Sequence, residues 1–283
     1  MRRTLLEIPI PFFDISVPIY SYGFMMMVGF LFAVLAVRRK AVYEGIDPYL
    51  MTDLGIYTLL AGILGARVLF VMHHFDEYVK HPLEIFMIFK GGLSLYGGVI
   101  GASLMAVVFC RRRGLSPMKC LDMASVGLAL GLAFGRIGCF LNGCCYGAVV
   151  KDNAMLAVVF PRTKDKLGNI DGSPVYFHHL EEGVVGFADP ISFPVYPTQI
   201  YSALGAFALF LILSNVYAYK KRDGEIFLLA LIIYAPMRFY WEILRDDSAP
   251  VLGGLTVSQV IGIPVFLGAL ALFISGRRRL EKT

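Results

Sequence analysis

Seven stretches of about 20 residues, each almost free of charged side chains, recur along the sequence. They lie near residues 17–37, 52–71, 91–110, 120–141, 198–217, 225–244 and 255–275. A helix rises 1.5 Å per residue, so each stretch matches the roughly 30 Å hydrocarbon core of a bilayer. Hydrophobic residues make up 57% of the 283 residues, and mean hydropathy is +0.68. We therefore predict an all-α polytopic membrane protein with about seven transmembrane helices, organised as one transmembrane domain over 1–283.

Basic clusters follow every odd-numbered stretch and none of the even-numbered ones. They begin at Arg38, Arg111, Lys220 and Arg277. Short cytoplasmic loops are enriched in Lys and Arg, so we predict an N-terminus outside and a C-terminus in the cytoplasm. The net charge of +5 belongs to these clusters, which indicates membrane lipids as contacts and no nucleic-acid partner.

Two segments outside the apolar stretches are predicted to lie on the outer side. Residues 1–14 contain no cleavage site of small residues and are interrupted by proline, so they predict an arm on the outer interface. The segment 148–196 is too long for a simple connection. It predicts a small external (periplasmic) head inserted into the transmembrane domain.

Charged residues inside the apolar stretches each need a reason, because burying one costs about 2.5–3.5 kcal/mol or more. Four stand out: Arg67, Arg136, Arg238 and Glu242. Arg238 and Glu242 are four residues apart, so they can form an ion pair on one helix face. For this pair and for Arg67, a structural and a functional role both remain open.

The sequence around Arg136 favours a functional role for this residue. The glycines at 127, 131 and 135 share one helix face and allow a neighbouring backbone to approach closely. Helix packing explains these glycines but leaves the arginine without a partner. A guanidinium beside the glycine-rich segment 138–147 offers a forked donor and uncovered amides, which suit an anion.

The four polar residues Tyr22, Tyr96, Arg136 and Arg238 are predicted to lie at one depth. Each is about five to seven residues from the outer end of its stretch, or about 7–11 Å. An aromatic belt explains the tyrosines but not the arginines. We interpret this layer as a site for a lipid phosphate headgroup, with the acyl chains left in the bilayer.

These residues belong to blocks that resemble the bacterial prolipoprotein diacylglyceryl transferases. The stretch Gly135–Gly147, GRIGCFLNGCCYG, is similar to the family signature G-R-x-G-N-F-x-N-x-E-x-x-G. Further similar blocks are YSYG at 20–23, GGLSLYGG at 91–98, YPTQIY at 196–201, residues 238–245, and Ser258-Gln259. They follow the family order along nearly the whole chain, and the family also has seven spans with the N-terminus outside.

The resemblance implies a reaction and its partners. Such enzymes transfer the diacylglyceryl group of phosphatidylglycerol to the lipobox cysteine of a prolipoprotein signal peptide and release glycerol phosphate. They work in the bacterial cytoplasmic (inner) membrane and need no cofactor and no metal. The nucleophile is the thiol of the substrate, so the enzyme has to deprotonate it and stabilise a departing phosphate.

Carried over by position, the resemblance assigns phosphate binding to Arg136 and Arg238, with Tyr96 and Tyr22 as further catalytic candidates. The other substrate-binding candidates are Asn142, Gly138, Gly147, Gln199, Tyr201, Glu242 and Arg245.

Several positions depart from the family pattern. Tyr96 and Tyr196 stand where histidines are usual, and Cys139 and Cys144 replace the Asn and Glu of the signature. Either Tyr96 acts as the base, with a pKa lowered by nearby arginines, or it only orients substrate, or the chemistry is altered.

Five cysteines raise rival interpretations. Cys110 and Cys120 are predicted to lie near the inner face as reduced, apolar packing groups. Cys139, Cys144 and Cys145 fit packing or a structural disulfide better than metal, because their spacing matches no standard zinc pattern. The alternative functions are a lipid- or anion-binding transporter, or a membrane thiol or metal protein that uses these three cysteines. The histidine pairs at 73–74 and 178–179 are predicted to be solvated loop residues.

Overall fold

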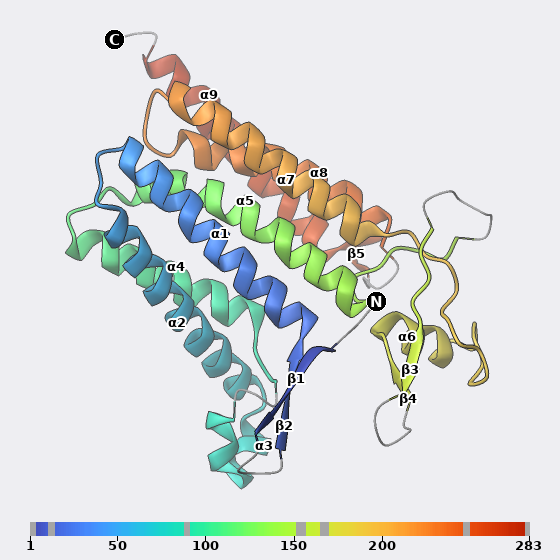
Figure 1. The fold of residues 1–283 in the computed structure, drawn as a ribbon. Coiled ribbons are helices and arrows are strands. Elements are labelled where there is room, and N and C mark those ends of the chain that lie inside the picture. The colour runs from blue at the N-terminus through green and yellow to red at the C-terminus, as the bar shows by residue number, and fades with distance from the viewer. Residues whose placement is uncertain are drawn as a thin grey trace. The chain divides into compact units, whose positions relative to one another are not determined.

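The computed structural model describes residues 4–10, 15–87, 91–150, 157–164, 170–245 and 250–280 (Figure 1). These residues form two compact units, Val34–Ala124 and the combination of Met1–Ala33 with Ser125–Thr283.

Seven helices of the described chain are long and apolar enough to cross a membrane, which confirms the predicted fold class. They are α1 (Ser21–Tyr43), α2 (Pro48–His73), α4 (Leu95–Arg112), α5 (Pro117–Asn142), α7 (Thr198–Val216), α8 (Glu225–Ile243) and α9 (Val257–Leu280). The short 3₁₀ helix η3 (Tyr217–Tyr219) extends α7. Lys40 and Arg111 lie inside the last turns of α1 and α4, because backbone hydrogen bonding continues beyond the apolar part of a helix.

Two helices begin later than hydropathy predicts. Residues before Ser21 form a hairpin of β1 (Thr4–Ile10) and β2 (Ile15–Tyr20), in which Ile8 pairs with Val17. The β-branched residues of β2 favour a strand over a helix, so the predicted N-terminal arm has regular structure. Helix α4 begins at Leu95 because Gly91 and Gly92 have φ of +92° and +76°, which a right-handed helix cannot contain.

In the unit Val34–Ala124, α2 packs against α4 through facing glycines (Figure 1). A Cβ added at Gly97 would lie 2.3 Å from the carbonyl oxygen of Gly65, and one at Gly101 would lie 2.4 Å from that of Ala61. Small residues at these positions therefore permit a backbone approach that any side chain would prevent.

Arg67 has a structural role within this unit. Its guanidinium donates to the carbonyl oxygens of Ile85, Gly91 and Gly92 at 2.9 Å and of Glu84 at 2.5 Å, and only 7% of the residue is exposed. These acceptors follow α3 (Phe75–Lys80) in the 3₁₀ helix η1 (Pro82–Phe86) and the loop before α4. Arg67 thus supplies hydrogen-bond donors to backbone carbonyl groups that would otherwise lack partners. Of the two roles left open for Arg67, this contact supports the structural one.

In the other unit, α8 packs against both α7 and α9 (Figure 1). Helix α1 crosses the glycine face of α5, as the spacing of glycines predicts. A Cβ at Gly29 would lie 2.9 Å from that of Phe134, and one at Gly131 would lie 3.5 Å from that of Ala33. The hairpin of β5 (Pro250–Leu252) and β6 (Leu255–Thr256) leads into α9.

The segment predicted as a head folds at the end of α5. It contains β3 (Arg162–Lys164), β4 (Ile170–Gly172) and α6 (Pro174–Glu181), shown in yellow-green in Figure 1. A small core of Tyr146, Phe160, Val175 and Val195 stabilises it. The amide of Val175 donates to the carbonyl oxygen of Gly143 at 3.2 Å, which joins this core directly to the signature segment.

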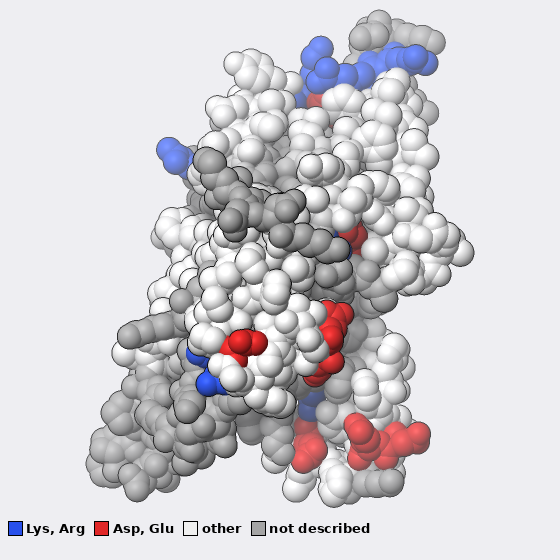
Figure 2. All heavy atoms as spheres, turned by 90° about the vertical axis from the view of Figure 1, so that its right-hand side faces the viewer, with Lys and Arg blue, Asp and Glu red and all other residues white. Residues whose placement is uncertain are grey.

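The outer surface of the described helices is largely apolar, as lipid contact requires. Exposed side chains include Leu31, Leu64, Ile100, Leu204 and Leu272, one from each of five membrane-length helices. Figure 2 shows a face on which most described atoms belong to uncharged residues, with one group of Lys and Arg side chains at its upper end.

Candidate active site

The predicted ion pair between Arg238 and Glu242 is present on α8. Arg238 Nη1 lies 2.6 Å from Glu242 Oε2, and Arg238 Nη2 donates to Ser258 Oγ of α9 at 3.0 Å. Glu242 is 5% exposed, so its carboxylate needs these cationic neighbours. Arg238 is thereby held from two helices with part of its guanidinium still open.

Arg245 is a second arginine near the Glu242 carboxylate. Its Nη1 lies 4.0 Å from Glu242 Oε2. The backbone of Arg245 pairs with Gly147 in an antiparallel bridge, and the Ala148 amide donates to Leu244 O at 2.9 Å. A Cβ at Gly147 would lie 2.7 Å from Leu244 O, so only glycine lets these two segments meet.

Arg136 lies beside this group without a carboxylate partner. It interacts electrostatically with Arg238 and with Cys145, but no hydrogen bond or ion pair to it occurs among the described residues. Arg136, Arg238, Arg245 and Glu242 together carry a formal charge of +2, three positive charges against one negative. A partly buried excess of this kind favours an anion.

Three thiols lie close together near the arginines. The sulfur atoms of Cys139, Cys144 and Cys145 all lie within 4.8 Å of one another. All five cysteines of the chain are free thiols in the structure, so of the two predicted alternatives for the outer cysteines, packing and a structural disulfide, the disulfide is not formed. Cys110 and Cys120 are buried, as their predicted packing role requires.

The loop that carries two of these thiols is held by the start of α7. Thr198 Oγ1 donates to the Cys145 carbonyl oxygen at 2.9 Å, and Gln199 Nε2 donates to that of Cys144 at 2.8 Å. Gln199 is fully buried. It therefore supports the loop through the backbone, and Tyr201 lies two residues further along the same helix.

The Cys145 thiol is strongly affected by its neighbours. Hydrogen bonds with Cys139 and Cys144 hold the pKa of the Cys145 thiol well below its usual range. The positive charges of Arg245 and Arg136 act in the same direction, against the effect of burial. Negative charge is thus favoured beside the arginines.

Tyr22 and Gly138 meet where α1 crosses α5. A Cβ at Gly138 would lie 3.2 Å from Tyr22 Cδ2 and 3.1 Å from Met25 Cβ, so the close approach at Gly138 is made by a helix of this chain. Tyr22 interacts electrostatically with Arg136. Asn142 ends α5 and hydrogen-bonds to the Cys144 thiol.

The sequence matches one family of known proteins over most of its length. A sequence model of the family "prolipoprotein diacylglyceryl transferase" matches residues 10–275. The chain belongs to the prolipoprotein diacylglyceryl transferase family.

Relatives of similar length support this membership. The phosphatidylglycerol–prolipoprotein diacylglyceryl transferase 2 of Clostridium perfringens is 32% identical over 90% of each chain. The transferase of Finegoldia magna is 30% identical over 95% of each chain, and that of Bacillus cereus is 32% identical over 93% of this chain and 89% of its own. The alternative of a transporter is not favoured by these matches.

Tyr96 and Tyr22 both lie near the beginnings of their helices. Tyr96 is the second residue of α4, in the unit Val34–Ala124, and is 59% exposed. Tyr22 is likewise the second residue of its helix, whereas Arg136 and Arg238 lie six and five residues before the ends of theirs. The tyrosines therefore lie in the first turns of their helices and not five to seven residues inside, because α1 and α4 begin late.

The histidine prediction is wrong for one pair. His178 and His179 lie on α6, and His179 is 1% exposed. The His178 Nδ1 atom hydrogen-bonds to the hydroxyl of buried Tyr146, and Nε2 lies 3.4 Å from Glu182. Both histidines pack against the signature segment. The loop-like composition of the surrounding sequence does not indicate this packing.

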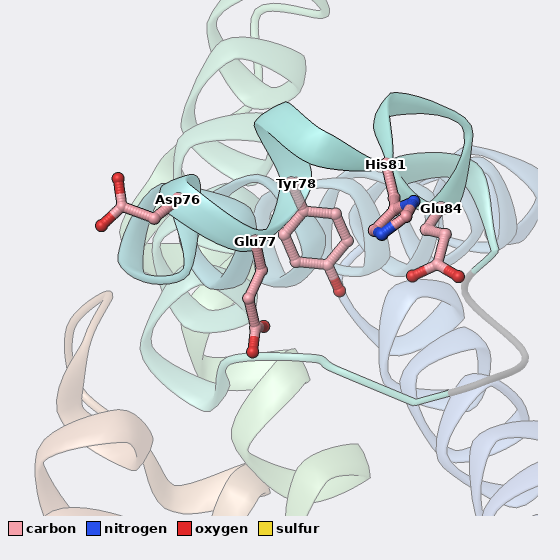
Figure 3. Close-up of a pocket in the computed structure, with 5 residues that line it drawn as sticks. All are labelled: Asp76, Glu77, Tyr78, His81 and Glu84. Atoms are coloured by element: carbon pink, nitrogen blue, oxygen red, sulfur yellow. The ribbon is translucent and has the colours of Figure 1, made fainter.

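A separate pocket of about 440 Å³ lies in the unit Val34–Ala124. It is lined by Asp76, Glu77, Tyr78, His81 and Glu84 (Figure 3). Figure 3 shows the Asp76 carboxylate directed away from Tyr78 and His81. Its acidic lining contrasts with the positive charge expected of a phosphate site.

Proposed function

We propose that this protein is a phosphatidylglycerol–prolipoprotein diacylglyceryl transferase. It transfers the diacylglyceryl group from phosphatidylglycerol to the lipobox cysteine of a prolipoprotein and releases glycerol phosphate. The observation that carries the proposal is Arg136, which has no acidic partner among the described residues and lies beside Arg238 and Arg245. The family membership supplies the reaction that this anion site supports.

The reaction needs stabilisation of a leaving phosphate. The substrate thiolate attacks the glyceryl carbon, the carbon–oxygen bond breaks, and a second negative charge develops on the departing phosphate. Guanidiniums fixed before the reaction stabilise that charge more effectively than water does. Arg238 is already oriented by Glu242 and Ser258, so it needs little rearrangement to bind the phosphate.

The remaining site residues act on position and shape in this proposal. Asn142 and Tyr22 line the headgroup site beside Arg136, while Gln199 and Thr198 hold the loop of Cys144 and Cys145. Gly138 and Gly147 allow the backbone segments around the site to approach closely. Tyr201 supports the site from α7.

Tyr96 is the proposed base for the substrate thiol, since it occupies the position where the family usually has a histidine. We expect Tyr96→Phe to lower the transfer rate by at least about 10²-fold, the smaller end of general-base effects. The rate should be measured across a series of pH values. Full activity of Tyr96→Phe at every pH would exclude this role.

The proposed location is the bacterial cytoplasmic membrane, with the arginine site open to the outer leaflet. Prolipoprotein signal peptides present their lipobox on that side of the membrane. The segment 148–196 then forms the external head over the site, and the basic ends of α1, α4 and α9 face the cytoplasm.

A reconstituted assay tests the function. The purified protein is incubated with a lipobox peptide in vesicles of phosphatidylglycerol, and the peptide mass and free glycerol phosphate are measured. We expect a peptide heavier by one diacylglyceryl group and an equal amount of glycerol phosphate. A peptide with serine in place of the cysteine, and vesicles of phosphatidylcholine, are the controls. Folded protein that gives no product with the cysteine peptide would overturn the proposal.

A further inference from the structure

The three thiols of Cys139, Cys144 and Cys145 have the spacing of a metal site. Their sulfur atoms lie within 4.8 Å of one another. Sulfur ligands at 2.3 Å from a tetrahedral zinc ion are about 3.8 Å apart, so shifts of about 1 Å or less bring all three into coordination. Among the divalent metal ions available to proteins, zinc is one that thiolate ligands favour.

The backbone is already shaped to present these ligands. Cys145 has φ of +58°, the left-handed region, and is the one described residue other than glycine with a positive φ. Such a conformation costs about 1–2 kcal/mol and persists where the surroundings enforce it. Here the side chains of Thr198 and Gln199 fix the two carbonyl groups of the loop, and Gly143 turns the chain with φ of +73°.

Charge also fits a bound ion. Zinc with three thiolates carries a formal charge of −1, and the phosphodiester of a lipid carries another −1. Together they match the +2 of Arg136, Arg238, Arg245 and Glu242. Three bare thiolates beside the phosphodiester would instead total −4, and three neutral thiols would leave the arginines half neutralised. Before the peptide binds, the ion therefore brings the site to neutrality, and the thiolate of the peptide adds one further negative charge when it coordinates.

One coordination position remains for a further ligand. Cys139 is buried in the last turn of α5, whereas Cys144 and Cys145 are partly exposed. No fourth Cys, His, Asp or Glu joins the group among the described residues. Zinc sites with three protein ligands and an open position are those that bind a reacting molecule, while structural sites have four.

We propose that Cys139, Cys144 and Cys145 bind one zinc ion, and that the thiol of the substrate peptide becomes its fourth ligand. Zinc binding stands on the thiol geometry alone, whereas the fourth-ligand role rests on the transferase function proposed above. The ion would assist the base, because coordination to zinc favours the thiolate form of the substrate.

The step balances without any further reactant. The peptide thiol coordinates zinc and gives its proton to the base. The sulfur electron pair then forms the carbon–sulfur bond to the diacylglyceryl group, and the pair of the broken carbon–oxygen bond leaves on glycerol phosphate. The neutral thioether dissociates from the ion, and no electron is gained or lost by the metal.

Metal content and cobalt spectroscopy test the binding site. The full-length protein is purified under reducing conditions, supplied with zinc or cobalt(II), and desalted. We expect about one metal per chain and, with cobalt, the intense visible bands and thiolate charge transfer of a tetrahedral sulfur site. Cys144→Ser and Cys145→Ser should lose this spectrum. The matched control is Cys110→Ser, which removes a buried thiol far along the chain and should retain it.

The substrate then tests the role of the ion. Adding the lipobox peptide to the cobalt protein should shift the charge-transfer band towards four sulfur ligands, and the serine peptide should leave it unchanged. Four results would each overturn the proposal. They are absence of metal, a spectrum unchanged by Cys144→Ser, a disulfide between two of the three cysteines in the reduced preparation, and a spectrum unchanged by the cysteine peptide. Full transferase activity of metal-free protein would do so too, while leaving the proposed function intact.

Discussion

The arginines inside the apolar helices differ in what satisfies their guanidiniums. Arg67 donates to four carbonyl oxygens of its own unit, and Arg238 has Glu242 and Ser258. Arg136 has neither kind of partner among the described residues. Residue type alone does not distinguish these cases, because the sequence does not indicate that backbone carbonyl groups will gather around Arg67. Of these three arginines, Arg136 is therefore the one that can bind an incoming anion without losing a hydrogen bond or ion pair to another described residue.

Arg136→Lys should lower kcat/KM for phosphatidylglycerol by about 10²-fold or more, the scale of losing one fixed donor to a developing charge. A lysine keeps the charge but loses the planar fork that binds two phosphate oxygens. Initial rates in phosphatidylglycerol vesicles measure the effect.

The control for this substitution is Arg277→Lys on α9, which alters an arginine paired with Glu225 at 2.7 Å. Its activity should stay within a few-fold of the unchanged protein. Equal losses in both variants, or none in Arg136→Lys, would contradict the assignment of Arg136 to the phosphate.

At the scale of elements, glycines decide which helices approach most closely. Helix α5 meets α1 along Gly131 and Gly138, as the spacing of glycines predicts. The contact between α2 and α4 was not predicted, although Gly97 and Gly101 repeat the same four-residue step. Spacing reveals that a face is suited to close packing but not which partner covers it.

Gly97→Ala should destabilise the contact of α2 and α4 by about 1–3 kcal/mol, the usual range for overpacking. Its Cβ would lie 2.3 Å from the Gly65 carbonyl oxygen and 2.6 Å from Leu69 Cβ. Thermal unfolding in detergent measures the change. Gly268→Ala on α9 is the matched control, since nothing lies within 4 Å of its added Cβ. A fall in stability for Gly268→Ala as large as for Gly97→Ala would refute the packing argument.

For the whole molecule, hydropathy was sufficient to predict the seven spans and their order. It misplaced the beginnings of α1 and α4, because strand pairing at Ile15–Tyr20 and the positive φ of Gly91 and Gly92 do not alter hydropathy. The grouping of Arg136, Arg238 and Glu242 also followed from sequence. The meeting of three thiols did not, because the turn at Gly143 and Cys145 brings residues of unusual spacing together.

The predicted orientation can be tested by fusions in a bacterial host. Alkaline phosphatase joined after residue 185, within the proposed head, should be active because that enzyme folds outside the cytoplasm. The same fusion at the C-terminus should be inactive, since the basic residues at the end of α9 predict a cytoplasmic location. The reversed pattern would show that the arginine site faces the inner leaflet.

The central claim is that a whole diacylglyceryl group passes from phosphatidylglycerol to a cysteine thiol. Phosphatidylglycerol carrying one isotope in the acyl-bearing glycerol and another in the headgroup glycerol tests this directly. After incubation with the lipobox peptide, mass spectrometry should find the first isotope on the peptide and the second only in released glycerol phosphate. Headgroup isotope on the peptide, or acyl chains without their glycerol, would contradict the account.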